Sequence, residues 1–268
     1  MKYADFLTAV RMKSPLIYCL TNFVTVNDCA NVLLAAGASP VMSLDIREAA
    51  ELAQNANAVL INIGTPSEAA VEAMLTAGEA ANQAGVPVIL DPVGAGATAI
   101  RREICRTLLD RIRFAAIRGN ASEIASLAGK EFGGRGVDAG AEVLDEVADA
   151  AKSLASGAGC IVAASGAVDV VTDGTKMLFC RNGIADMTRI TGSGCMSGAL
   201  AAGFIGASPE DPYAALAASV LTMGIAGETA GEMLMPGQGT GTLRSNLIDA
   251  VSRLDAMNMT IRGRYEEK

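Results

Sequence analysis

The sequence predicts a single α/β domain, spanning residues 1–268, in which helices cover both faces of a central, mostly parallel β-sheet. Short β-branched runs alternate with segments rich in small residues, which is typical of strand–helix–strand units. The runs are almost continuously apolar, as parallel strands covered on both faces should be. The chain is 51% hydrophobic and shows no Pro/Ser-rich linker, so one large core is expected.

The elements follow from these runs in order. Buried strands are predicted at Leu16–Leu20, Val41–Leu44, Ala58–Ile63, Val86–Leu90, Phe114–Ile117 and Ile161–Ala164. An antiparallel hairpin is predicted from Val168–Thr172 and Lys176–Cys180, which Asp173-Gly174 joins. Helices are predicted at Val24–Ala36, Thr65–Ala84, Ala99–Arg111, Ser122–Ala128, Ala139–Ser156, Gly194–Gly206, Asp211–Glu232 and Thr242–Met257.

Local signals set several helix ends. Gly37 and Gly85 are expected as C-terminal stops, because glycine adopts the left-handed conformation found there. The run Thr65-Pro66-Ser67-Glu68 predicts a capping box, with Thr65 as the N-cap and Glu68 at the third helical position. The short glycine-rich run 133–136 is expected to be a flexible loop rather than a domain boundary.

Composition excludes several function classes. There are 21 Lys+Arg against 29 Asp+Glu, a net charge of −8, and aromatic residues make up 4% with no Trp, so no nucleic-acid partner is expected. The absence of histidine rules out Ser-His-Asp and Cys-His catalysis and His-ligated zinc. The 6 cysteines form no Cys-x-x-Cys pair, which indicates reduced thiols and a cytoplasmic protein.

One stretch requires a membrane check. Ile190 to Pro209 carries no charge, but it consists mostly of Gly, Ala, Ser and Thr. Such a composition favours a buried, tightly packed helix over a membrane span, and no signal-peptide core stands at the N-terminus. No membrane partner is expected.

Four clusters of polar residues and glycines are predicted at the carboxyl ends of the strands, where open α/β sheets bind ligands. The first is Thr21-Asn22-Phe23-Val24. Asn22 is suited to hydrogen-bond a substrate and equally suited to cap the following helix. The second runs from Asp91 to Thr98 and contains Gly94-Ala95-Gly96. It fits a phosphate or metal–water site, or a tight turn with Asp91 as the turn former.

The third cluster runs from Arg118 to Glu123. An arginine at a strand end can clamp a phosphate, while Asn120 and Glu123 fit an N-cap with its capping-box acid. The fourth cluster is Thr191-Gly192-Ser193-Gly194-Cys195, which opens an uncharged helix. Glycines before a helix N-terminus favour anion binding, and the pKa of a thiol in the first turn tends to fall. Neither a P-loop nor a Gly-x-Gly-x-x-Gly fingerprint is present.

Together and in this order, the clusters resemble the hydroxyethylthiazole kinases, a family with the ribokinase-like fold. The resemblance spans about residues 14 to 206 and is far more specific than any single motif. The matching segments are Thr21-Asn22, residues 37–42, Asn62-Ile63-Gly64-Thr65, residues 90–98, residues 117–124 and residues 188–196.

The resemblance implies ATP- and Mg²⁺-dependent phosphorylation of the primary alcohol of 4-methyl-5-(2-hydroxyethyl)thiazole, a thiamine salvage step. It implies that Met42, Asn22 and Gly192 bind the substrate and that Arg118, Ser165 and Gly194 bind ATP. Asp91 and Glu123 would organise Mg²⁺ through water. The family is typically a homotrimer with sites at subunit boundaries.

Cys195 stands where the wider fold group usually has an aspartate base. A thiolate there is a plausible but weak base, and the competing interpretation is that Cys195 only shapes the pocket. The sequence also departs from the family pattern in the stretch Tyr18-Cys19-Leu20, where a His is expected in many relatives, at Ala167, where an acid is common, and at Ser193, where Thr is frequent. Two rival functions remain open, a kinase of another small primary alcohol and a non-catalytic ligand-binding protein.

Overall fold

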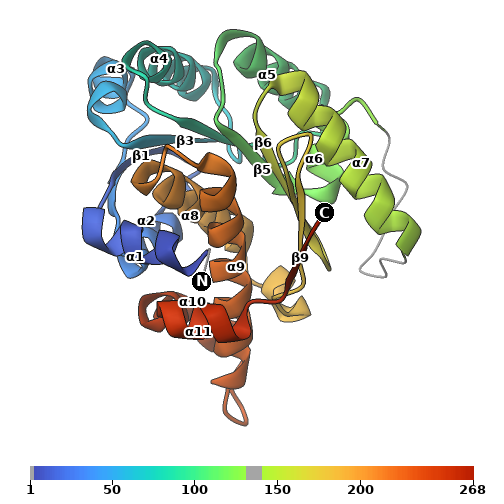
Figure 1. The fold of residues 1–268 in the computed structure, drawn as a ribbon. Coiled ribbons are helices and arrows are strands. Elements are labelled where there is room, and N and C mark those ends of the chain that lie inside the picture. The colour runs from blue at the N-terminus through green and yellow to red at the C-terminus, as the bar shows by residue number, and fades with distance from the viewer. Residues whose placement is uncertain (1–2, 131–140) are drawn as a thin grey trace.

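The computed structural model describes residues 3–130 and 141–268. Nine strands form one sheet in the order β2-β1-β3-β4-β5-β6-β7-β8-β9 (Figure 1). The first six strands in this order pair in parallel and the last three pair antiparallel. They are β1 (Leu16–Leu20), β2 (Ser39–Met42), β3 (Ala58–Asn62), β4 (Val88–Asp91), β5 (Ala116–Asn120), β6 (Ile161–Ser165), β7 (Asp169–Thr172), β8 (Met177–Cys180) and β9 (Tyr265–Glu267).

Helices cover both faces of the sheet, as the sequence predicts (Figure 1). One face carries α3 (Ile46–Asn55), α4 (Glu68–Ala84), α5 (Ala99–Arg111), α6 (Ala121–Leu127) and α7 (Ala141–Ala158). The other face carries α1 (Ala4–Lys13), α2 (Val26–Ala36), α8 (Ser193–Ala207), α9 (Pro212–Glu232), α10 (Thr240–Arg253) and α11 (Ala256–Arg262). A short 3-10 helix, η1 (Ala185–Arg189), precedes α8.

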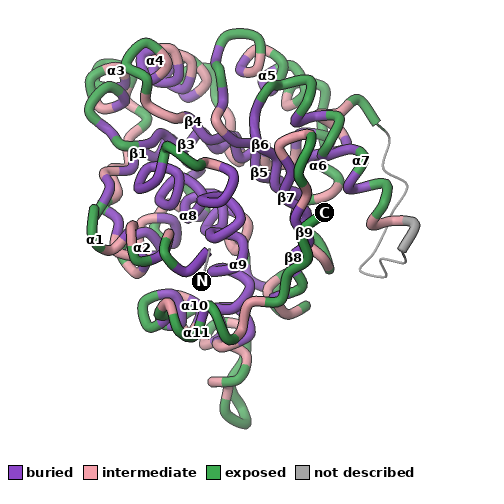
Figure 2. The backbone as a smooth tube through the Cα atoms, viewed as in Figure 1, coloured by how far each residue is buried: buried purple, intermediate pink, exposed green. Residues whose placement is uncertain are grey.

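The sheet separates two hydrophobic cores, one beneath each helical layer. Helix α8 lies at the centre of its layer and is buried from Cys195 to Ala207 (Figure 2). It packs against α9, α2 and strand β3. The uncharged stretch that begins at Ile190 therefore contains a buried core helix, as predicted from its small residues.

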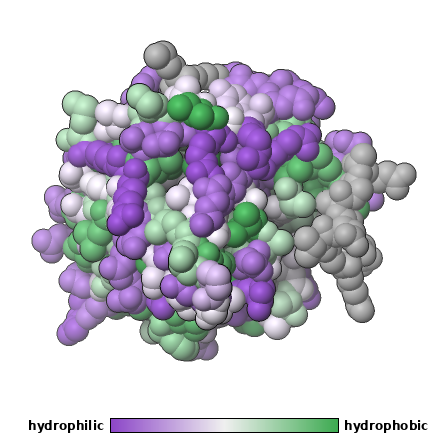
Figure 3. Space-filling view, turned by 90° about the horizontal axis from the view of Figure 1, so that it is seen from below, coloured by the Kyte–Doolittle hydropathy of each residue, from purple (hydrophilic) through white to green (hydrophobic). Residues whose placement is uncertain are grey.

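Among the described residues, one helix is long and apolar enough to cross a membrane by length and composition alone. This helix is α9, and 89% of its most apolar window is buried inside the structure. The outer face over α10 and α11 mixes polar and apolar side chains and shows no single continuous apolar surface (Figure 3).

Most predicted elements are confirmed within one or two residues, and four boundary predictions are wrong. Strand β5 ends at Asn120, three residues after its predicted end at Ile117. Strand β2 begins and ends two residues earlier than predicted, because Ser43 and Leu44 already lead into α3. The N-cap of α4 is Ser67, whose side chain accepts from the backbone of Ala70, so the predicted cap at Thr65 lies two residues too early. The predicted helix over 242–257 is two helices, because Asp255 caps a new one.

Four elements have no counterpart in the sequence prediction: α1, α3, η1 and β9. Helix α3 (IREAAELAQN) has an amphipathic pattern that the sequence analysis missed, and its fully buried residues are two alanines, Ala49 and Ala53. Strand β9 is exposed and exists through its pairing with β8. The first two residues of the helix predicted at 139–156 and the predicted glycine-rich loop at 133–136 lie outside the described residues.

Candidate functional site

The candidate site lies at the carboxyl edge of the parallel strands, where four neighbouring strands each end on a polar residue. Asn62 ends β3 and is in register with Asp91, which ends β4. Asn120 ends β5 and is in register with Ser165, which ends β6. The parallel arrangement thus brings residues from distant parts of the sequence to one edge, opposite the N-terminus of α8.

Asn62 is the centre of the polar contacts at this edge. Its amide Nδ2 donates to Asp91 Oδ2 at 2.5 Å and to Cys195 Sγ at 3.3 Å. Its Oδ1 accepts from Asn22 Nδ2 at 3.0 Å and from the backbone N–H of Gly64 at 2.9 Å. One amide therefore connects β1, β4 and the start of α8.

Asn22 supports the turn before α2 and also contacts two residues of the candidate site. Its Oδ1 accepts from the backbone N–H and the hydroxyl of Thr25, both at 3.1 Å, which fixes the turn before α2. Its Nδ2 donates to Asn62 and, at 3.3 Å, to Cys195 Sγ. The formal N-cap of α2 is Thr25, so Asn22 supports the helix start from the preceding turn.

Asp91 carries a buried carboxylate, and only one of its two oxygens accepts a hydrogen bond from the described residues. It is 1% exposed, and Oδ1 has no hydrogen-bond partner among the residues that the structure describes. Burial raises the pKa of this carboxyl to about 7, and the Glu123 carboxylate adds to the rise, while Arg118 and the Asn62 hydrogen bond oppose it. Gly198 of α8 faces it, since a Cβ at that position would lie 3.0 Å from Oδ2. A free, buried carboxylate oxygen of this kind suits a cation or a hydrogen-bond donor.

Glu123 forms the capping box predicted from the sequence. Its Oε2 accepts from the Asn120 backbone N–H at 2.7 Å, and the Asn120 side chain accepts from the Glu123 N–H. Its Oε1 accepts from the Gly94 backbone N–H at 2.8 Å. Both oxygens are thus engaged by the backbone, and Glu123 joins the turn after β4 to the start of α6.

Arg118 faces the opening of α8. It is 9% exposed, and its Nη2 donates to Ser165 Oγ at 2.9 Å. A Cβ on Gly194 would lie 3.0 Å from Nη1, so a larger residue there would crowd the guanidinium. The structure therefore brings together the three residues to which the sequence resemblance assigns ATP binding. Asp169 adds a nearby carboxyl whose pKa is raised to about 6 by burial, against the opposing effect of Arg118.

The turn from Thr191 to Gly194 opens α8 with glycine as N-cap. Gly192 has φ +89°, a left-handed conformation that favours glycine. The backbone N–H groups at a helix start lack partners within the helix and attract anions. With Arg118 beside Gly194, this turn is suited to hold a phosphate group.

Cys195 corrects one expectation about its ionisation. The helix start is predicted to lower the thiol pKa, but the pKa is raised, chiefly by burial and then by the neighbouring Asp91 carboxylate. Hydrogen bonds from Asn62 and Asn22 and one with Thr25 oppose the rise without reversing it. The resting thiol therefore carries its proton at neutral pH. All six cysteines are free and buried, in agreement with the expected reduced thiols.

Met42 lies apart from this group. It ends the edge strand β2, is partly buried, and packs against the core on the α8 side. Its register partner is Cys19 of β1, one residue before the strand end that leads to Asn22. Met42 thus borders the site from the sheet edge rather than joining its hydrogen bonds.

The sequence does not single out three further polar groups. Asn62 belongs to a segment that carries the family resemblance and lies one residue before the predicted strand end at Ile63, but the sequence analysis assigns it no role. Arg101 of α5 donates to the backbone carbonyls of Ile63 at 2.8 Å and Gly64 at 2.8 Å and so holds the segment after β3. Arg244 of α10 pairs with Asp28 of α2, and no local pattern predicts a contact between positions 216 residues apart.

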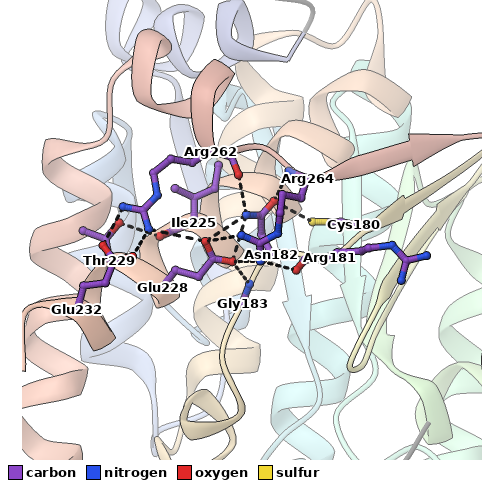
Figure 4. A network of polar contacts seen from close by, with 10 residues as sticks. All are labelled: Cys180, Arg181, Asn182, Gly183, Ile225, Glu228, Thr229, Glu232, Arg262 and Arg264. Atoms are coloured by element: carbon purple, nitrogen blue, oxygen red, sulfur yellow. Dashed lines mark hydrogen bonds and ion pairs between the residues drawn. The ribbon is translucent and has the colours of Figure 1, made fainter. Parts of the chain in front are cut away.

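A second polar network fixes the chain that leads from β8 toward the turn (Figure 4). Glu228 of α9 accepts from the Gly183 N–H at 2.8 Å, from Asn182 Nδ2 at 3.1 Å and from Arg264 at 2.7 Å. Arg262 donates to Glu232 on the next turn of α9. The opposite charges in this network satisfy one another, which gives it a structural role.

The residues at the edge fit a magnesium ion held partly by phosphate. No group of three or more His, Cys, Asp or Glu side chains that could hold a metal ion exists among the described residues. Mg²⁺ usually binds through one or two carboxylates together with water and substrate phosphates. The unpartnered Oδ1 of Asp91 fits such a site directly, whereas Glu123 fits through water.

Comparisons with known proteins point to one family. A sequence model of the Hydroxyethylthiazole kinase family matches residues 7–257. The chain is 46% identical over 269 residues to a hydroxyethylthiazole kinase of Desulfovibrio desulfuricans, covering 95% of this chain and 94% of that protein. It is 47% identical to one of Ruminiclostridium cellulolyticum, covering 93% of this chain and 91% of the other.

The comparison with solved structures points to the same family and fold. The structure of a hydroxyethylthiazole kinase protein from Pyrococcus horikoshii OT3 superposes with a TM-score of 0.90 at 35% identity, over 99% of this chain and 98% of that one. A Staphylococcus aureus pyridoxal kinase in complex with ADP superposes with a TM-score of 0.63 at 12% identity, over 94% and 97%. The second likeness concerns the fold alone, and both neighbours place the chain in the ribokinase-like class that the sequence resemblance implies.

Proposed function

The chain belongs to the hydroxyethylthiazole kinase family, and we propose that it transfers the γ-phosphoryl group of ATP to the hydroxyl group of 4-methyl-5-(2-hydroxyethyl)thiazole. The observation that carries this proposal is the meeting of Arg118, the Gly192–Gly194 turn and the free oxygen of Asp91 at one edge of the sheet. Phosphoryl transfer depends on positioning and on neutralising charge, and it needs no covalent intermediate on the protein.

The phosphate side of the site is assigned to Arg118, Ser165 and Gly194. Ser165 orients the Arg118 guanidinium through their hydrogen bond, and Gly194 leaves room beside it for a phosphate oxygen. The backbone N–H groups of the first turn of α8 complete an anion hole. This set would hold the β- and γ-phosphates of ATP.

The metal side is assigned to Asp91 and Glu123. Mg²⁺ bound there would neutralise charge on the phosphates. Asp91 offers its unpartnered oxygen, and Glu123, whose oxygens accept backbone N–H groups, orients coordinated water. Asn62 keeps the Asp91 carboxylate in place.

The alcohol side is assigned to Met42, Asn22 and Gly192. Met42 supplies an apolar surface for the thiazole ring at the edge of the sheet. Asn22 and Gly192 lie next to Cys195, the residue to which we assign contact with the reacting hydroxyl. Because the resting thiol is protonated, Cys195 accepts the proton of the alcohol only after losing its own. The competing role is that of a pocket residue.

We also infer that residues 1–268 act as one kinase domain, that the protein is a cytoplasmic homotrimer, and that neither nucleic acid nor membrane is a partner. One continuous sheet supports the first statement. The trimer is carried by the family resemblance and supported by exposed apolar side chains beside the site, with Phe23 78% and Val24 54% exposed.

The experiment is a substrate panel. Purified protein is incubated with ATP, Mg²⁺ and either the thiazole alcohol or other small primary alcohols, including a pyrimidine alcohol, and phosphorylated products are identified by mass. The proposal predicts the thiazole monophosphate with the highest kcat/KM. A preference for another alcohol favours the other kinase function, and nucleotide binding without any product favours a binding protein.

A further inference from the structure

The phosphate-binding turn is flanked by a buried carboxylate as well as by Arg118. Asp28 of α2 is 3% exposed, and a Cβ placed on Gly192 would lie 3.5 Å from its Oδ2. The same Cβ would lie 2.7 Å from Thr25 Cγ2, so α2 closely approaches the turn. A bare negative charge here would repel the anion that the turn is proposed to hold.

Arg244 of α10 compensates this charge. Its Nε donates to Asp28 Oδ1 at 2.8 Å, and its Nη2 donates to the same oxygen. The contact is charge-assisted and made at two points, and such contacts are stronger and better oriented than neutral hydrogen bonds. Asp28 Oδ1 is thus engaged, whereas Oδ2 faces Gly192.

The two sides of the turn are electrostatically opposed. Arg118 lies against Gly194, and the Asp28 carboxylate lies against Gly192. Without Arg244, the Asp28 charge would offset the attraction that Arg118 provides, because buried charges are poorly screened by solvent. With Arg244 in place, the Asp28–Arg244 pair is neutral and the field of Arg118 prevails.

We propose that Arg244 is a positioning residue whose role is to neutralise Asp28, so that the turn before α8 accepts the phosphates of the nucleotide. The proposal rests on the proposed function, because it concerns nucleotide phosphates at the same turn. It adds a residue from α10 to a site otherwise built from strand ends and α8. It also makes the effect of changing Arg244 depend on whether Asp28 is charged.

The test measures the dissociation constant of ADP, with Mg²⁺ present, by titration calorimetry. The variants are Arg244→Gln, Asp28→Asn and the two combined, with Arg111→Gln as a control that breaks a surface ion pair with Glu79. Arg244→Gln is expected to weaken ADP binding about 10- to 100-fold, the effect of exposing one charge near a phosphate. Asp28→Asn, the double variant and the control should all lie within about threefold of wild type.

If the contact between Asp28 and Arg244 is merely structural, the variants bind ADP differently from the proposal. If Arg244 only joins α10 to α2, the double variant binds ADP as weakly as Arg244→Gln, and that result would overturn the proposal. Wild-type binding by Arg244→Gln would also overturn it. Adenosine carries no phosphate, so its affinity should be equal in all variants, and a loss of adenosine binding equal to the loss of ADP binding contradicts the charge effect.

Thermal melting shows whether Arg244→Gln folds, and a second variant at the same position provides a test that does not depend on it. Arg244→Lys keeps the charge but loses the two-point contact. The proposal predicts ADP binding within about threefold of wild type for it, whereas a structural role predicts a larger loss. If wild-type protein binds no nucleotide, the proposed function fails and this proposal with it. If wild type binds ADP and all variants match it, only the role of Arg244 fails.

Discussion

Asp91 and Cys195 share one hydrogen-bond donor, the amide Nδ2 of Asn62, which lies 2.5 Å from Asp91 Oδ2 and 3.3 Å from Cys195 Sγ. The arrangement places a carboxyl from a strand end beside a thiol from a helix start, and both residues are buried. Burial raises the pKa of each, and the Asp91 charge raises that of Cys195 further. The ionisation of either group therefore depends on the other.

The first prediction concerns the base. Cys195→Ala should lower kcat strongly, by roughly 10²- to 10⁴-fold if a base is lost, and leave binding of the thiazole alcohol nearly intact. Cys195→Asp restores a carboxylate at this position and should keep or raise activity. Steady-state kinetics and direct binding of the alcohol separate the two roles, because a pocket residue predicts an active alanine variant and a harmed aspartate variant.

The pH dependence of the same variants follows from the raised thiol pKa. A base must be deprotonated, so wild-type kcat/KM for the alcohol should still be rising above pH 8.5, the ordinary thiol pKa being about 8.5. Cys195→Asp should shift this rise to lower pH, since a carboxyl loses its proton earlier. Identical profiles for wild type and Cys195→Ala would assign the rise to another group.

Arg118→Ala should weaken use of ATP more than binding of the alcohol. It removes a charged contact to phosphate and one of the two hydrogen bonds of Ser165, so kcat/KM for ATP should fall by a factor that corresponds to about 1.5–3 kcal/mol. Arg113→Ala is a matched control, because Arg113 is exposed and interacts with Asn82 on the surface away from the turn. Unchanged KM and kcat for ATP would remove Arg118 from the site.

Asp91→Asn should stabilise the protein in the absence of metal and nucleotide. The folded-state pKa of about 7 lies above the ordinary value of about 4, so the folded state holds this proton more tightly than the unfolded state. The associated stability is present below pH 4 and is lost as the pH rises to 7. Removing the charge should therefore add on the order of 1–3 kcal/mol at pH 8 and less at pH 5.

Thermal melting at the two pH values measures this effect. Asp249→Asn on the exposed face of α10 serves as the control and should change little at either pH. A uniform loss of stability in Asp91→Asn at both pH values would show that the Asn62 hydrogen bond outweighs the buried charge. Activity with Mg²⁺ should fall in the same variant, since it loses the proposed metal ligand.

The assembly is predicted to be a homotrimer. The mean hydropathy of +0.34 and the exposed Phe23 and Val24 beside the site favour a covered surface. Light scattering coupled to size-exclusion chromatography should give about three times the chain mass of 27.3 kDa. A mass equal to one chain would contradict this assembly.

The sequence was sufficient to predict the features that depend on local patterns of residues. Apolar runs located β1, β3 and β4 because these central strands are buried on both faces. Asn120 with Glu123 predicted a capping box that the structure contains. Asp91, Arg118 and the turn at Gly192 were predicted at one edge because parallel strands share a carboxyl edge.

Other features depend on tertiary contacts that no local pattern encodes. Strand β9 is exposed and forms by pairing with β8, whereas the amphipathic pattern of α3 is a local signal that the prediction missed. The pKa of Cys195 was predicted in the wrong direction because the helix start is a local feature, whereas burial and Asp91 are not. The Asp28–Arg244 pair joins residues of α2 and α10 that only the packing of these helices brings together.

The most direct measurement is a crystal structure of the protein with Mg²⁺, a non-hydrolysable ATP analogue and the thiazole alcohol. The account predicts the γ-phosphate at the N-terminus of α8 within hydrogen-bond distance of Arg118, the ion beside Asp91, and the alcohol oxygen between Cys195 and the γ-phosphorus. A nucleotide bound away from the Gly192–Gly194 turn, or a thiazole whose hydroxyl points away from Cys195 and the phosphate, would contradict it.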